Sequence, residues 1–438
     1  MAKQSPPGNG KTPKGKPSAL RNFFSILGPG LTTGAADDDP SGIATYSQTG
    51  AQFGYGQLWT ALFMLPFMIA VQEACARIGL VTGKGIASVV RKHYPPWILY
   101  SVVGLVLGAN TLNIGADIGA MAASAHLLVP IAFPILILLF ASLILTLEIF
   151  IAYPRYSRIL KWLSLVLLAY PITAILVREP WGTVLKATVL PHLEWNFGFL
   201  FIIIGVLGTT ISPYLFFWQA SQEVEEAKLK RYLHRPRVTV SSVKRLRIDN
   251  ATGMIFSEIT TWSIMVVGAT VLHTHGVTNI KTAADAARAL QPLVAGFPHA
   301  GYLAKLIFSL GIIGLGLLAV PILSASAAYA ISESFNWKAG LNLKLKQAHG
   351  FYGVITIATL IGLVINFIGI DPVKALVYSA VFNGIASVPL LFLIAHIAGS
   401  RKIMNQNKSG PLSNFFVWLS FAAMGLAALG MIVIFFLH

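Results

Sequence analysis

The sequence has few charged residues and only one cysteine. Charged side chains make up 11% of its 438 residues and hydrophobic side chains 55%, whereas soluble proteins carry about 25% charged residues. This balance excludes an ordinary soluble domain. The single cysteine, Cys75, excludes an internal disulfide and a cysteine-based metal cluster. The sequence also lacks a catalytic triad, a metalloenzyme motif and a nucleotide-binding glycine loop, so we expect neither an enzyme nor an ATP-driven pump in this chain alone.

Long apolar runs recur along the whole chain instead. A helix needs about 20 apolar residues to cross a bilayer, and the runs predict an all-α polytopic membrane protein. The expected spans are eleven, near 23–50, 57–81, 97–124, 128–152, 159–177, 198–222, 250–272, 301–330, 351–370, 373–398 and 413–437.

The net charge of +16 follows this expected topology. Most Lys and Arg residues fall in segments that a cytoplasmic N-terminus would place inside, with the exceptions Arg178, Lys186, Lys281, Arg288, Lys305 and Lys374. Such asymmetry is typical of the positive-inside rule and argues against nucleic acid as a partner. We expect a multi-pass protein of the plasma (inner) membrane with its C-terminus outside. Residues 1–22 are expected to form a disordered basic cytoplasmic tail without a cleavable signal peptide. We expect the basic inner loops to attract anionic lipid.

Three consecutive aspartates, Asp37, Asp38 and Asp39, lie within the first apolar run, in the string GPGLTTGAADDDPSG. An acidic side chain at membrane depth costs about 2.5–3.5 kcal/mol, so the triplet must be paired, solvated or bound to an ion. Pro40, Ser41 and Gly42 follow at once, and they predict an interruption of the helix over 37–42.

A second apolar run, at 198–222, contains the polar string GTTISP at 208–213. Interrupted segments at corresponding positions of two halves indicate inverted repeats around a transport site. We therefore expect one repeat over 23–177, a second over 198–398, and 413–437 as an additional eleventh helix. Unwound carbonyl groups and carboxylates together suit a cation.

These strings resemble the Nramp family of divalent-metal transporters, which share the LeuT fold. The resemblance rests on three stretches: the first break, VQEACARIGLVTGKG at 71–85, and GTTISPY at 208–214. It implies a LeuT-type fold of two inverted five-helix repeats with helices 1 and 6 broken. It also implies alternating access with a divalent cation as cargo and no resident cofactor.

The resemblance also implies a set of site residues. Asp39 keeps the metal-binding carboxylate of the family, and the carbonyls of Ala36 and Thr209 match its backbone ligands. The family's Asn, Met and His positions are Gly42, Ser212 and Tyr214 here. The expected metal ligands are Asp39, Asp38, Ala36, Thr209, Ser212 and Asn383, and the expected permeation or coupling residues are Asp37, Gly42, Asp117, Thr210 and Tyr214.

The departures favour a hard, hydrated cation. Without a thioether the remaining donors are oxygens, as Mg²⁺ prefers, with Mn²⁺ as its nearest competitor. The sequence thus looks similar to the Nramp-related magnesium transporter branch. The family's second helix-3 acid is Ala120 here and the ninth span has no arginine, so we expect transport without proton coupling. The alternatives are a proton-coupled Mn²⁺ or transition-metal importer and, in another class, an organic-cation or amino-acid carrier or a sensor.

Other polar residues of the expected spans carry open alternatives. Asp117 either lines the path or pairs with a hydrogen-bonding partner. Glu258 is functional by default as an intramembrane carboxylate, but no motif contains it. Glu73 and Arg77 are four residues apart and are expected to form a local ion pair on one helix face.

Overall fold

The computed structural model describes residues 29–151, 164–177, 179–231 and 238–437. These residues form helices and no strand, as the composition predicts. The expected tail at 1–22 lies outside the described residues. So do the first residues of the spans expected near 23 and 159.

The elements that correspond to the expected spans are α2 (Pro29–Asp37) with α3 (Pro40–Phe53), α4 (Trp59–Thr82), α6 (Pro96–His126), α7 (Phe133–Phe150), α9 (Ala169–Leu176), α11 (Phe197–Thr210) with α12 (Pro213–Arg231), α13 (Val240–Val267), α15 (Ala300–Ser334), α16 (His349–Ile365), α17 (Pro372–Gly399) and α19 (Pro411–Leu437). The short helices between them are α5 (Ile86–His93), α10 (Trp181–Val189), α14 (Ala283–Ala287) and α18 (Arg401–Met404). In the described part, eight helical stretches are long and apolar enough to cross a membrane.

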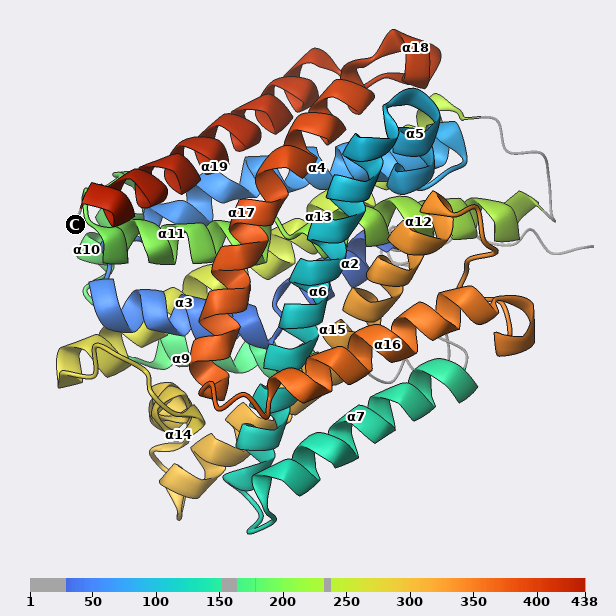
Figure 1. The fold of residues 1–438 in the computed structure, drawn as a ribbon. Coiled ribbons are helices and arrows are strands. Elements are labelled where there is room, and N and C mark those ends of the chain that lie inside the picture. Colours follow the sequence, from blue (N-terminus) through green and yellow to red (C-terminus); the bar gives the residue numbers. More distant parts are fainter. Residues whose placement is uncertain (1–28, 152–163, 178, 232–237, 438) are drawn as a thin grey trace, which may run out of the picture.

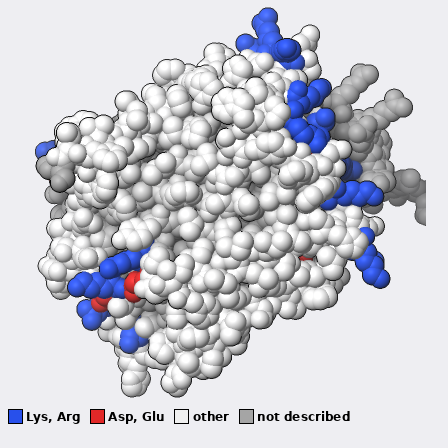
Figure 2. Space-filling model, in the orientation of Figure 1, with Lys and Arg blue, Asp and Glu red and all other residues white. Residues whose placement is uncertain are grey.

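The helices form one bundle around α6, which packs against α15, α16 and α17 (Figure 1). α7 and α19 lie at opposite edges of this view (Figure 1). Large apolar side chains of α19, such as Leu426 and Phe436, are exposed. Figure 2 shows Lys and Arg at the two ends of the molecule, most of them at the end where α5 and α18 lie, with a broad uncharged band between. We call the end at α5 and α18 the basic end. This distribution is typical of a protein embedded in a bilayer.

The first expected span is broken between α2 and α3. Asp38 and Asp39 lie between the two helices, and Asp39 has an extended backbone (φ −68°, ψ 174°). Pro40 disfavours a helical conformation at the residue before it, and its fixed φ then suits the first position of the next helix. The break is therefore confirmed but narrower than expected. Ser41 and Gly42 lie in the first turn of α3, so their assignment to the break is wrong.

The second break, between α11 and α12, is built in the same way. α11 ends at Thr210, Ile211 leaves the helical region (φ −118°, ψ 61°), and Pro213 begins α12. In both broken spans a proline starts the second half-helix, which explains why each break is only two residues long.

Two close helix contacts hold the broken spans in place. A Cβ added at Gly34 of α2 would lie 2.3 Å from the carbonyl oxygen of Gly253 in α13. One added at Gly208 of α11 would lie 2.0 Å from the carbonyl oxygen of Ala380 in α17. Real Cβ atoms do not approach backbone so closely, and small residues allow this packing in membrane bundles. Each broken span is thus supported by the backbone of a continuous helix.

Candidate metal site at the two helix breaks

Asp39 caps α3 and is 2% exposed. Its Oδ1 accepts hydrogen bonds from the backbone N–H of Gly42 at 2.8 Å and from the hydroxyl of Ser41 at 2.6 Å. Its Oδ2 accepts a hydrogen bond from the side-chain amide of Asn113 in α6 at 2.8 Å. Capping explains the position of the carboxylate, since the first N–H groups of a helix need an acceptor.

Asn113 joins three elements and was missed by the sequence interpretation. Besides donating to Asp39, it accepts a hydrogen bond from the hydroxyl of Ser379 in α17 at 2.8 Å. The signal in the sequence is the spacing of Asn110, Asn113 and Asp117. Residues three or four positions apart lie on one face of a helix. Asn113 and Asp117 lie near Asp39, whereas Asn110 donates to the carbonyl of Leu323 in α15.

Asp37 and Asp38 face α13 instead. The hydroxyl of Ser257 donates to Asp37 Oδ2 at 2.7 Å, and that of Thr261 donates to Asp38 Oδ1 at 3.2 Å. Both aspartates are fully buried. The triplet is therefore divided, with one carboxylate directed toward α6 and two toward α13.

Two further buried carboxylates lie near the triplet. Asp117 is within electrostatic reach of Asp39, and Glu258 of α13 is within reach of Asp37 and Asp38. In the described part of the chain, neither Asp117 nor Glu258 has a hydrogen-bond partner for either oxygen. The sequence left open whether Asp117 pairs with another residue, and no described residue forms a hydrogen bond with its carboxylate.

The second break brings hydroxyl and carbonyl groups to the first. The Tyr214 hydroxyl donates to the carbonyl of Ala36 at 2.8 Å and so joins α12 to the last turn of α2. Ser212 donates to the carbonyls of Gly208 and Thr209, each at 2.6 Å. The two carbonyls expected as ligands, those of Ala36 and Thr209, therefore each accept a hydrogen bond and keep a second lone pair.

Thr209 and Thr210 also contact the first broken span through Tyr46 of α3. The Thr209 hydroxyl donates to the Tyr46 hydroxyl at 2.9 Å, and the Thr210 hydroxyl lies 3.1 Å from it. The two breaks thus meet through the pairs Tyr214–Ala36 and Tyr46–Thr209. Their meeting agrees with the expected shared site.

The observed contacts assign no role to Asn383 or Gly42. Asn383 is fully buried in α17, and neither atom of its amide has a partner among the described residues. Gly42 lies beside the site, where an added Cβ would be 3.1 Å from the Tyr46 ring and 3.6 Å from Asp39 Oδ1. The roles expected for both residues stay predictions.

Among the described residues, the carboxylates near the first break have no basic partner. Within the described ranges, no Lys, Arg or His forms an ion pair with Asp37, Asp38, Asp39, Asp117 or Glu258. Nor do these ranges contain a group of three or more His, Cys, Asp or Glu side chains close enough to chelate a metal ion. The arrangement suits a cation that keeps part of its water shell, because charge attracts it while few side chains contact it directly.

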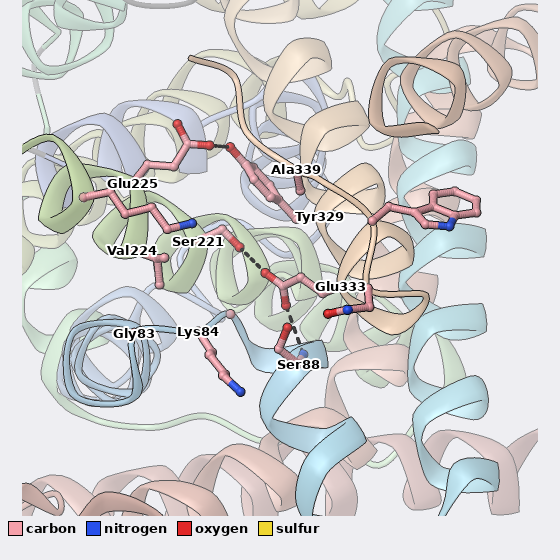
Figure 3. Close-up of a pocket in the computed structure, with 13 residues that line it drawn as sticks. Gly83, Lys84, Ser88, Ser221, Val224, Glu225, Tyr329, Glu333 and Ala339 are labelled. Carbon is pink, nitrogen blue, oxygen red and sulfur yellow. Dashed lines mark hydrogen bonds between the residues drawn. The ribbon is translucent and has the colours of Figure 1, made fainter. Parts of the chain in front are cut away.

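A second cluster of carboxylates, the buried Glu225 and the half-buried Glu333, lies near the basic end in a pocket of about 170 Å³ (Figure 3). Glu225 of α12 accepts hydrogen bonds from Tyr329 of α15, from the N–H of Leu341 at 3.0 Å and from the amide of Asn342 at 2.6 Å. Glu225 lies twelve residues after Pro213, which is about 18 Å along the helix. We call this cluster the end pocket.

Glu333 of α15 is the other carboxylate of the end pocket. It accepts hydrogen bonds from the N–H of Ser88 in α5 at 3.1 Å and from the hydroxyl of Ser221 in α12 at 3.2 Å (Figure 3). The two glutamates thus tie α5, α12, α15 and the following loop together. Sequence reasoning singled out neither, because their partners come from distant segments.

The bundle and its two facing breaks define a class, that of multi-pass membrane transporters with discontinuous helices. The chain matches the family described as natural resistance-associated macrophage protein-like (Nramp) over residues 30–434, and it belongs to this family. The family membership expected from the three strings is therefore confirmed.

Relatives and solved structures agree with this membership. The chain is 27% identical over 388 residues to the divalent metal cation transporter MntH of Klebsiella pneumoniae strain 342, covering 86% of this chain and 87% of the relative. It is 26% identical over 412 residues to the MntH of Caldanaerobacter subterraneus subsp. tengcongensis, covering 90% and 89%.

Solved structures share the fold. A crystal structure of the Eremococcus coleocola manganese transporter, in complex with an aromatic bis-isothiourea compound, has a TM-score of 0.72 and 17% identity, with 97% of this chain and 88% of that chain covered. MhsT in complex with L-phenylalanine has a TM-score of 0.59 and 13% identity, with 93% and 97% covered. The expected LeuT-type fold is confirmed.

Proposed function

We propose that this protein carries divalent metal cations across a membrane by alternating access at the two helix breaks. Membership of the Nramp family supports a metal cargo, and the relatives are named divalent metal cation transporters. The observation that carries the proposal is the group of buried carboxylates at the first break, which has no basic partner in the described ranges. Burying charges without a partner is costly, and a bound cation offsets that cost.

Asp39 is the principal proposed ligand because it lies at the break and faces α6. Further proposed oxygen ligands are Asp38, Ser212, Asn383 and the carbonyls of Ala36 and Thr209. The proposed path contains Asp37, Gly42, Asp117, Thr210 and Tyr214. No covalent chemistry is proposed for any of these residues.

The names of the similar proteins favour the Mn²⁺ alternative over a preference for Mg²⁺, since the structural neighbour is a manganese transporter. The donor set adds a second expectation. Ser212 and Gly42 supply no sulfur or amide ligand, and oxygen ligands suit both Mn²⁺ and Mg²⁺. We therefore propose Mn²⁺ as a substrate and Mg²⁺ as an effective competitor.

Proton coupling distinguishes two candidate mechanisms. Three features favour uncoupled transport: Tyr214 carries a phenol, Ala120 carries no acid, and α16 has no arginine. Inward movement of a divalent cation then gains about 4.6 kcal/mol per 100 mV, twice the value for one charge. The observation that favours the coupled alternative is Asp117, whose oxygens have no partner in the described part and which interacts with Asp39.

A flux assay tests both parts of the proposal. The full chain is reconstituted in liposomes that contain a Mn²⁺-sensitive dye or a pH dye. We expect Mn²⁺ uptake that is driven by an inside-negative potential and inhibited by excess Mg²⁺, with an apparent affinity about 100-fold lower for Asp39→Asn. Acidification that follows Mn²⁺ in a fixed ratio would replace the uncoupled mechanism by the coupled one. Absence of Mn²⁺ flux would overturn the metal cargo and favour an organic-cation or amino-acid carrier on the same fold.

We also infer a membrane topology from the charge distribution and the two helix breaks. The basic end is proposed to face the cytoplasm, with the N-terminus inside, the C-terminus outside and anionic lipid beside the basic loops. Two inverted repeats, 23–177 and 198–398, are supported by the two proline-started half-helices, with 413–437 outside both.

A further inference from the structure

Glu258 is a buried carboxylate that the proposed Asp39 site does not use. It is 5% exposed, and neither of its oxygens has a hydrogen-bond partner in the described part of the chain. It lies on α13 within one turn of Ser257 and Thr261, the two hydroxyl residues that donate to Asp37 and Asp38. Glu258 and Thr261 are three residues apart and therefore lie on one face of α13, the face whose Thr261 donates to Asp38.

The two aspartates opposite Glu258 are only half satisfied. Asp37 Oδ1 and Asp38 Oδ2 have no partner among the described residues, although both side chains are fully buried. Glu258 interacts electrostatically with both aspartates. The carboxylates of Asp37 in α2, Asp38 in the break and Glu258 in α13 together leave four oxygens without hydrogen-bond donors. The described ranges supply no Lys, Arg or His for them. A buried carboxylate in this condition needs a cation or a proton.

This group is separate from the Asp39 carboxylate. Both oxygens of Asp39 accept hydrogen bonds, from Ser41, Gly42 and Asn113, on the side of α3 and α6. Asp37 and Asp38 are bound to α13 on the other side of the break. The contact of Gly34 with Gly253 closes the gap between α2 and α13 toward the start of both helices. This close packing favours access of a cation from the side of the break.

We propose that Asp37, Asp38 and Glu258 form a second cation site next to the Asp39 site, which holds a divalent cation with part of its water shell. The carboxylates do not form a ready chelate, so water completes the contacts of the ion. The inference rests on the proposed function, since both sites serve the same cargo. Two adjacent sites also let an arriving ion weaken the binding of the one ahead of it, which favours release.

Equilibrium binding of Mn²⁺ to the purified full chain tests the proposal. We expect about two Mn²⁺ per chain for the unchanged protein, and about one for each of Glu258→Gln and Asp39→Asn. In liposomes, Glu258→Gln should raise the KM for Mn²⁺ about tenfold, which is about 1.4 kcal/mol. The matched control is Glu148→Gln, a buried carboxylate of α7 that bonds to Ser324 and lies outside both sites. It should keep about two Mn²⁺.

The possible outcomes separate this inference from the proposed function. One Mn²⁺ per chain, lost in Asp39→Asn and kept in Glu258→Gln, would overturn the second site and leave the transport site standing. No Mn²⁺ binding to the unchanged chain would overturn both. If Glu258→Gln does not fold, Asp37→Asn is measured in its place, and the second site requires that it lose one Mn²⁺ and keep the other.

Discussion

Two groups of buried carboxylates in this protein differ in what surrounds them. At the first break, Asp117 and Glu258 have no hydrogen-bond partner among the described residues, and Asp37 and Asp38 each leave one oxygen free of partners there. In the end pocket every oxygen of Glu225 and Glu333 accepts a hydrogen bond. The residue types are alike, and all but the half-buried Glu333 are buried, but the supply of donors differs.

This difference separates two tasks. A carboxylate whose oxygens are all hydrogen-bonded by other elements, as in the end pocket, holds those elements together. Asp39 differs from these glutamates, because two of its three donors, Ser41 and Gly42, belong to the helix that it caps. A buried carboxylate without donors weakens the fold by itself, and binding of a cation removes that penalty. The break region is thus suited to taking up and releasing ions, and the end pocket to fastening α12 and α15. Single substitutions in the two regions should therefore affect different measurements.

Asp39→Asn should have the largest effect. Asparagine keeps the helix cap but removes the charge, at a cost of about 3 kcal/mol or about 100-fold in apparent Mn²⁺ affinity. The measurement is Mn²⁺ uptake into proteoliposomes over a range of concentrations. Glu333→Gln is the matched variant of the end pocket and should keep uptake within about threefold. The reverse pattern would contradict the division of tasks.

Glu225→Ala should mainly reduce stability. It leaves the Leu341 N–H and the Asn342 amide without their acceptor, at a cost of about 2–3 kcal/mol. We expect the thermal midpoint in detergent to fall by roughly 5 °C. Glu258→Gln, which loses no hydrogen bond to a described residue and removes a buried charge, should not lower the midpoint. Equal losses in both variants would remove the contrast between the regions.

Asn113→Ala tests whether the partners of Asp39 position it for the ion. The variant loses the hydrogen bonds to Asp39 and Ser379. We expect the KM for Mn²⁺ to rise about tenfold, while the maximal rate changes little. Asn110→Ala serves as the control, because Asn110 lies on the same helix but donates to the carbonyl of Leu323. A similar KM change in the control would indicate a general loosening of α6.

Thr261→Val should have the smallest effect. Its hydrogen bond to Asp38 is long, at 3.2 Å, and valine has nearly the same shape. We expect a change of about twofold in the KM for Mn²⁺, close to 0.5 kcal/mol. Ser257→Ala, which removes the shorter bond of 2.7 Å to Asp37, provides the comparison and should change the KM more. An effect of Thr261→Val as large as that of Asp39→Asn would make Asp38 the main ligand.

The sequence by itself determined the features that depend on near neighbours in the chain. Apolar runs predicted the spans, and the dipeptides Asp39-Pro40 and Ser212-Pro213 marked both breaks, because proline acts on the residue before it and on the helix after it. The local pair Glu73–Arg77 is confirmed for the same reason, since four residues span one helical turn. The error at Ser41 and Gly42 came from reading small residues as a longer interruption.

The tertiary structure decided which helix each carboxylate faces. Asn113 and Asp39 are 74 residues apart, and Ser257 and Asp37 are 220 apart. Such pairs form only after the helices pack, and the packing depends on contacts such as Gly34 with Gly253. No local pattern reports on those contacts, because a helix of this composition is apolar on most faces. The division of the aspartate triplet between α6 and α13 therefore followed from packing alone.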